Sequence, residues 1–228
     1  MKKLFLSILT VSVILTSCKT LGQLGIKPTG LETVMALKSI LDSSTFKAIK
    51  KLKNVNDQGI EAAIPSEVST VLKTLRTVGY GDEIDKVTKS IGSASTLVIG
   101  ESEEIMNDAI KELKFTDAVA VVLGGEDAAT NVLKRAMYST VKNRYSTRLG
   151  QELDKTDVNT YWPIAMGAYN IFAKNKMQGS LPDFLAERAV DGLFIAIGKE
   201  EAKARTDYKA LGNSVVTKVF DYYSDKKS

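Results

Sequence analysis

The chain has 228 residues, of which 44% are hydrophobic and 25% are charged, and its formal net charge is +4. This composition is typical of a globular protein with a substantial core, and the small charge does not indicate a nucleic-acid partner. The sequence contains no histidine, which excludes Ser-His and Cys-His nucleophiles and argues against the common zinc and haem sites. We therefore expect neither a cofactor nor a metal.

The first residues have the pattern of an export signal. Lys2 and Lys3 precede an apolar stretch, residues 4–15, which is too short to span a bilayer because a spanning helix needs about 20 residues. Leu15-Thr16-Ser17-Cys18 follows and contains the only cysteine of the chain. This motif resembles the lipobox of bacterial lipoproteins, and the alternative is an ordinary export signal with an unrelated cysteine.

The resemblance to lipoproteins implies cleavage between Ser17 and Cys18 and attachment of palmitate-like acyl chains to Cys18. Two or three acyl chains would make membrane attachment effectively permanent, and the modified thiol could form no disulfide. We expect a signal peptide at 1–17 and a lipidated tether at 18–29. Lys19, where an Asp would indicate inner-membrane retention by resemblance to the enterobacterial rule, favours the outer membrane facing the periplasm.

The remaining chain, residues 30–222, is predicted to be one all-α, bundle-like domain. Apolar residues at helical spacing predict helices over 31–41 and 46–52, with Ser43–Thr45 capping the second. A turn at 54–59 precedes a helix from Pro65 that stops at Gly79.

One long helix is predicted over 84–113, although Gly92 and Gly100 each cost about 1 kcal/mol relative to Ala. Thr116 is expected to cap a short helix, although the valines of 118–123 leave a β-strand as the alternative.

Four further helices complete the predicted domain. They begin at Glu126-Asp127, at Thr156 or Asp157 with Pro163 in the first turn or at a kink, at Ser180 as N-cap, and near Val215. The helix capped by Ser180 is expected to run toward Glu200-Glu201, and residues 223–228 to form a frayed tail.

Three stretches resemble the domain-of-unknown-function 4197 family. They are IPSEVSTVLKTLRTVG (64–79), FTDAVAVVLGGEDAATNVLKRA (115–136) and RAVDGLFIAIGKEEAKAR (188–205). The resemblance implies an all-helical, exported protein, frequently with a lipoprotein signal. The family has no assigned activity, so the resemblance implies no catalytic residues.

A candidate polar site comprises Asp117, Asp191, Glu201 and Arg205. Glu201 and Arg205 have the i,i+4 spacing of a surface ion pair, and Asp191 is expected to be the most buried acid because it lies within an apolar helix face. The alternative is that Asp191, Glu201 and Arg205 line a polar opening.

Two further sets of residues have two interpretations each. Tyr161, Trp162, Tyr169 and Phe172 either pack in the core or line an aromatic pocket for an apolar or sugar ligand. Lys134, Arg135, Lys142, Arg144 and Arg148 either form a solvated helix face or contact anionic lipid headgroups or peptidoglycan.

Two functional hypotheses follow. The favoured one is a non-catalytic, membrane-anchored envelope protein that binds a partner protein or an apolar ligand through an apolar groove or patch. The alternative is a histidine-free, carboxylate-dependent hydrolase or lyase acting on cell-wall glycans, which requires two inward-facing acids from separate helices, one of them with a raised pKa.

Overall fold

The computed structural model describes residues 26–56, 64–77, 79, 81–174, 176 and 178–224. Its helices are α1 (Gly30–Asn56), α2 (Ser66–Thr77), α3 (Gly81–Glu112), α4 (Ala118–Leu123), α5 (Ala128–Leu153), α6 (Val158–Phe172), α7 (Leu181–Thr206), the 3₁₀ helix η3 (Tyr208–Leu211) and α8 (Ser214–Ser224). The residues described contain no strand, which confirms the predicted all-α fold.

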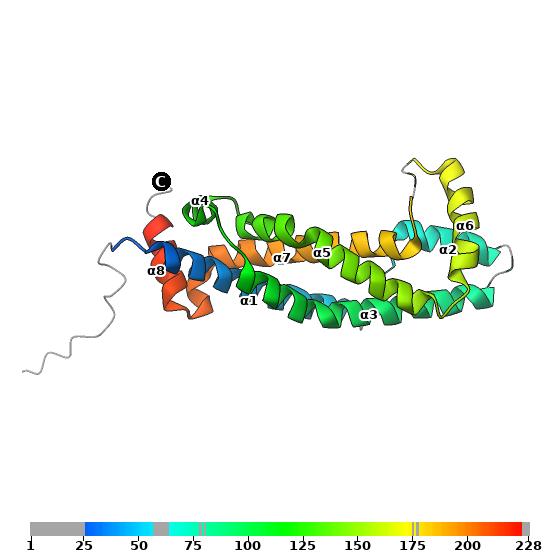
Figure 1. The fold of residues 1–228 in the computed structure, drawn as a ribbon, viewed down its shortest axis with the longest axis horizontal. Coiled ribbons are helices and arrows are strands. Elements are labelled where there is room, and N and C mark those ends of the chain that lie inside the picture. The colour runs from blue at the N-terminus through cyan, green and yellow to red at the C-terminus, as the bar shows by residue number, and fades with distance from the viewer. Residues whose placement is uncertain are drawn as a thin grey trace, which may run out of the picture.

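Four long helices form the body of an elongated molecule. α1 packs against α3 and α7, and α5 also packs against α3 and α7, so the four close a ring around a shared core. α4 and α8 pack at one end against α1, whereas α2 and α6 pack together at the other end (Figure 1). The elongated body formed by these four helices is called the rod.

The core consists of the apolar positions that recur at helical spacing. Its largest fully buried side chains include Leu37, Ile40, Ile91, Met106, Ile110, Leu133, Leu149 and Ile197. Each contributes roughly 1.5–3 kcal/mol by leaving water, so packing rather than helix propensity holds the four helices together. No helix within the described ranges combines the length and apolar character needed to cross a bilayer.

The predicted break between the first two helices is wrong, because α1 continues through Ser43–Thr45. Ser44 and Thr45 are both fully buried, so their small side chains face the core instead of capping a new helix. Ser and Thr favour caps through local hydrogen bonds, and here the tertiary packing of the surrounding helix overrides that preference.

The long helix predicted over 84–113 is confirmed as α3, and the short helix predicted behind Thr116 is confirmed as α4. The N-cap of α4, however, is not Thr116. Asp117 is the N-cap of α4, and its Oδ1 accepts a 2.9 Å hydrogen bond from the Ala120 amide. Gly79 has a φ of +103°, which fits its predicted role at the end of α2.

Pro163 lies inside α6 and not in its first turn, and the predicted alternative, a kink at Pro163, stays a prediction. Two predicted boundaries differ from the structure. Ser180 caps α7 as expected, but the helix continues beyond Glu200-Glu201 to Thr206. Tyr223, assigned to the frayed tail, is a buried residue of α8.

Candidate functional site

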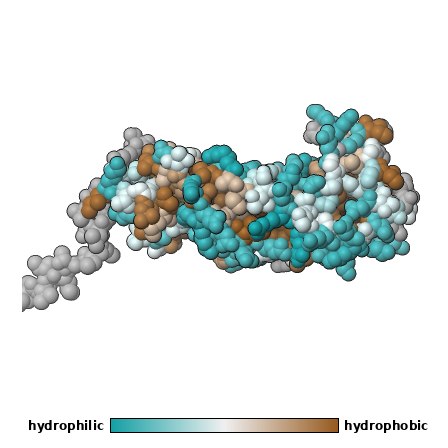
Figure 2. Space-filling model, in the orientation of Figure 1, coloured by the Kyte–Doolittle hydropathy of each residue, from teal (hydrophilic) through white to brown (hydrophobic). Residues whose placement is uncertain are grey.

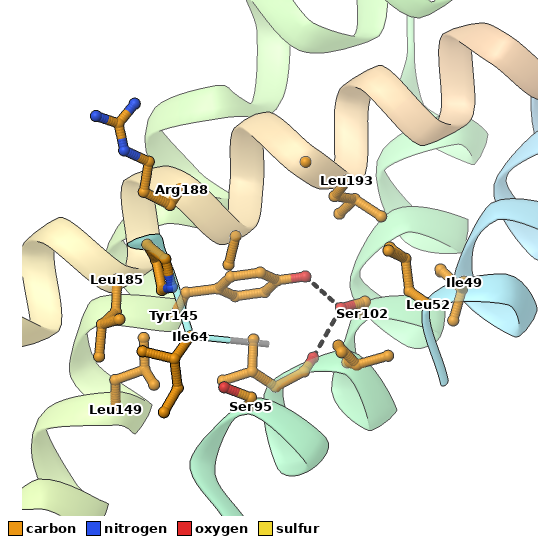
Figure 3. Close-up of a pocket in the computed structure, with 15 residues that line it drawn as sticks. Ile49, Leu52, Ile64, Ser95, Ser102, Tyr145, Leu149, Leu185, Arg188 and Leu193 are labelled. Atoms are coloured by element: carbon orange, nitrogen blue, oxygen red, sulfur yellow. Dashed lines mark hydrogen bonds between the residues drawn. The ribbon is translucent and has the colours of Figure 1, made fainter. Parts of the chain in front are cut away.

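The four long helices line a partly open apolar pocket of about 350 Å³ near the middle of the rod. Its walls come from α1, α3, α5 and α7, together with the two residues that precede α2 (Figure 3). The lining residues are Ile49, Leu52, Ile64, Pro65, Ser95, Val98, Ile99, Ser102, Tyr145, Leu149, Leu185, Arg188, Ala189, Gly192 and Leu193. This volume lies at the lower end of the usual range for small-molecule sites.

A buried hydroxyl pair is the main polar feature of the pocket. Ser102 donates a 2.7 Å hydrogen bond to the Val98 carbonyl within α3, and its Oγ also contacts the hydroxyl of Tyr145 from α5. Because the single Ser102 proton is used for the carbonyl, Tyr145 is the donor to Ser102 Oγ. The Tyr145 oxygen therefore retains the capacity to accept a hydrogen bond from a bound molecule.

The environment keeps the Tyr145 hydroxyl neutral. Burial raises the pKa of Tyr145 to about 12, and the hydrogen bond with Ser102 offsets only part of that rise. The pocket thus presents a neutral acceptor inside an apolar wall.

Two α7 residues at the pocket differ in what they offer a ligand. The Arg188 guanidinium points away from the Tyr145 ring (Figure 3), and it lies 3.4 Å from Glu67 Oε1. Gly192 leaves open space, because a Cβ built on it would meet no atom within 4 Å. Because Gly192 lines the pocket, a substitution there would add its Cβ at the pocket wall without a clash.

The predicted polar site is only partly assembled, and its central pair is buried rather than exposed. The Glu201 side chain is 0% exposed and that of Arg205 is 9% exposed, with 2.7 Å between Glu201 Oε1 and Arg205 Nε. The i,i+4 spacing predicted the pairing correctly, but the expectation of a surface ion pair is wrong.

Glu201 closes the N-terminus of α5. Its Oε1 accepts a 3.0 Å bond from the Ala129 amide, and its Oε2 accepts 2.6 Å bonds from the amide and the hydroxyl of Thr130. Asp127, the local N-cap residue of α5, makes no side-chain capping bond. A carboxylate at this position also interacts favourably with the helix dipole.

Arg205 closes the C-terminus of α4. Its Nη1 and Nη2 donate to the carbonyls of Val122 and Val121 at 3.0 and 3.1 Å. Gly198 permits the close approach on this side of α7, because a Cβ there would lie 3.3 Å from the Asp127 Cβ. The ion pair therefore fastens the α4–α5 connection to α7.

Asp191 and Asp117 do not join this pair. Asp191 is half-buried and lies 3.2 Å from Lys134 Nζ, and ten residues along α7, about 15 Å, separate it from Glu201. Among the described acids Glu201 is more buried than Asp191, contrary to expectation. Asp117 is exposed and caps α4.

The α6 aromatic residues whose side chains are described, Tyr161, Trp162 and Tyr169, do not surround a ligand-sized pocket. Trp162 is buried and Tyr161 is partly buried, and both border a gap of only about 10 Å³ beside α2 and α3. Tyr169 is partly buried against the core but does not line that gap. Ser17, Cys18 and the side chain of Phe172 lie outside the described residues.

The basic residues of α5 are partly paired with acids of neighbouring helices. Lys134 contacts Asp191, Lys142 contacts Glu187, and Arg148 contacts Glu101 at 3.2, 3.4 and 3.1 Å. Arg144 lines a broad, half-polar groove between α3 and α5. Contact of this face with lipid or peptidoglycan stays a prediction.

The family described as "Protein of unknown function (DUF4197)" matches residues 27–221. The chain belongs to this family. No curated protein and no solved structure matches it. Within this DUF4197 member, two of the three family-like stretches meet in space, because Glu201 and Arg205 from 188–205 bind the backbone of 115–136.

Sequence reasoning did not identify Ser102 and Tyr145 as a site. A signal for Ser102 was present, since it is the polar residue that interrupts an otherwise apolar face of the third helix. Its partner Tyr145 is 43 residues away and follows the ordinary core rhythm of α5. No local pattern distinguishes it from a packing residue.

Proposed function

We propose that this DUF4197 protein is an exported, lipid-anchored binding protein that holds one apolar small molecule between its four long helices. The observation that carries the proposal is the 350 Å³ pocket, whose walls are mainly aliphatic and which contains a buried polar pair. Small-molecule sites typically combine apolar walls with a few placed polar groups.

The chemistry of the walls supports a narrow ligand class. Isoleucine, leucine and valine side chains favour an acyl, prenyl or similarly apolar body. The Tyr145 oxygen favours a hydroxyl or N–H donor on that body, and the guanidinium of Arg188 points out of the pocket and so does not favour an acid inside it. The proposed ligand is a neutral, largely apolar molecule with one hydrogen-bond donor.

The positions of the buried carboxylates and the directions of their pKa shifts favour a binding protein over a glycan hydrolase. Glu200 and Glu201, the buried acids of the described residues, are adjacent on α7 rather than on facing helices. Burial alone would raise the pKa of Glu200, but hydrogen bonds from Lys203 and Lys51 outweigh it and lower that pKa. Partial burial raises the pKa of Asp42 on α1, but Asp42 does not line the pocket.

A pocket-filling substitution tests the binding role. Gly192→Leu places an isobutyl group in the open space, whereas Gly100→Leu adds the same group to an exposed position of α3 with equally open surroundings. The full chain is titrated with the neutral apolar dye N-phenyl-1-naphthylamine. We expect saturable dye fluorescence with the unchanged protein and Gly100→Leu, and its loss with Gly192→Leu.

The anchor requires a separate test because Cys18 lies outside the described residues. Cys18→Ser should move the protein from the membrane fraction to the soluble periplasmic fraction or leave the leader uncleaved. Intact mass of the unchanged protein should show a chain that begins at Cys18 and carries acyl groups. A bare thiol with the leader attached would contradict the anchor without affecting the dye result.

A further inference from the structure

Exposed apolar side chains gather at the end of the rod where α1 begins. Ile26 is 61% exposed, and Leu31 and Met35 in the first two turns of α1 are 70% and 48% exposed. Leu123 at the end of α4 is exposed at the same end, since α4 packs on α1 and α8. Figure 2 shows hydrophobic residues on this end of the molecule. We refer to these four residues as the end patch.

The chain that precedes the patch is short. Only residues 19–25 separate Cys18 from Ile26, so a fully extended chain places Ile26 within about 29 Å of Cys18. The opposite end is much farther away, because the 32 residues of α3 alone extend about 48 Å toward α2 and α6. An acylated Cys18 therefore brings the end patch, and not the far end, to the lipid surface.

The far end of the rod also carries exposed apolar residues, so the two ends can be compared directly. Ile164 and Ile171 of α6 are 69% and 73% exposed, as much as Leu31. Exposure alone would not distinguish the two ends, whereas the reach of the tether does. Within the described part of the chain, the end patch is the exposed apolar area that lies within the reach of the tether from the proposed anchor.

We propose that the end patch rests on the bilayer, with Leu31 and Met35 inserted at the boundary between headgroups and acyl chains. This inference depends on the lipid anchor of the proposed function. Interfacial apolar side chains are buried about 5–10 Å into this boundary. The anchor supplies the attachment, and the patch orients the rod so that its far end projects away from the membrane.

A single-tryptophan reporter tests the orientation. The lipidated full chain carries Trp162→Phe, so that the native tryptophan does not contribute, together with either Leu31→Trp or the matched control Ile171→Trp. Each variant is reconstituted into phosphatidylcholine vesicles with or without bromine on the acyl chains, which quenches nearby indole fluorescence. We expect most of the fluorescence at position 31 to be lost in brominated vesicles and that at position 171 to be unchanged.

The outcomes separate this inference from the anchor. If intact mass of the reconstituted protein shows a bare Cys18, the anchor fails and the inference fails with it. If Cys18 is acylated but position 31 is unquenched, the patch is covered by the tether or by a second copy, and only the inference is overturned. Equal quenching at both positions means that the rod lies flat, which also overturns it. Should Leu31→Trp fail to fold, Ile26→Trp replaces it, because Ile26 precedes α1.

Discussion

The buried ion pair between Glu201 and Arg205 of α7 joins the C-terminus of α4 and the N-terminus of α5 to that helix. Glu201 binds the first amides of α5, and Arg205 binds the last carbonyls of α4. Breaking a buried pair leaves an uncompensated charge, which is far more costly than losing a surface contact.

Glu201→Gln should therefore lower the free energy of unfolding by about 3–5 kcal/mol, because the Arg205 charge loses its partner while buried. Urea denaturation followed by circular dichroism measures the loss. The matched control is Asp108→Asn, which removes an exposed i,i+3 pair with Lys111 and should cost less than about 1 kcal/mol. Similar losses in both variants would contradict a structural role for the buried pair.

We expect the ionisation of the Tyr145 hydroxyl to lower the stability of the protein at alkaline pH. Its pKa is raised from 10.0 to about 12 in the folded protein, so the folded state binds this proton more tightly than the unfolded chain. The associated stability is complete below pH 10 and is lost as pH rises from 10 toward 12, by an amount of order 2 kcal/mol. Urea titrations between pH 9 and about 12 measure this window.

Tyr145→Phe isolates that effect. The variant lacks the hydroxyl, so its stability should change less between pH 10 and 12 than that of the unchanged chain. A pH profile identical to that of the unchanged protein would show that Tyr145 ionises normally in the fold.

We expect the protonation of Glu32 to lower the stability of the protein at acidic pH. Its pKa is lowered to about 2, chiefly by the hydrogen bond from Lys218 and next by the one from the Thr29 amide. The stability that Glu32 contributes is therefore complete above pH 4.5 and is lost as pH falls toward 2. Carbon NMR titration of the Glu32 carboxyl measures this pKa directly, and Lys218→Met should move it back toward 4.5. An unmoved value in the variant would exclude Lys218 as the cause.

We expect two substitutions of Trp162 to differ in how much they lower the free energy of unfolding. Its Nε1 is buried and has no hydrogen-bond partner among the residues that the structure describes. Phe keeps the aromatic packing and removes this donor, so Trp162→Phe should cost less than about 1.5 kcal/mol, whereas Trp162→Ala should cost about 3–5 kcal/mol. Urea midpoints of the two variants decide the comparison, and a costly Trp162→Phe would indicate a hydrogen-bond partner for the indole.

Helical periodicity was sufficient where the structure follows local rules. It predicted α3 as one helix through Gly92 and Gly100, because apolar residues continue at the same spacing on both sides. It failed at Ser44 and Thr45, where cap-forming residues fit into the core of a continuous α1. The local preference of a residue type does not reveal which face the surrounding bundle will bury.

The candidate sites show a similar division. Spacing predicted the pairing of Glu201 with Arg205, but its burial depends on α5 amides from about 70 residues earlier in the chain. The apolar pocket likewise forms only where four helices meet, so no single sequence segment predicts it. Contacts between distant segments therefore account for what the sequence did not predict.

Native mass spectrometry of the membrane-extracted protein tests the central claim most directly, because it detects a ligand that remains in the pocket. The unchanged chain and Gly100→Leu should each carry one additional apolar small molecule, and Gly192→Leu, with its pocket filled, should not. The same result for all three proteins, whether one adduct or none, would contradict the claim that the pocket between the four long helices is a binding site.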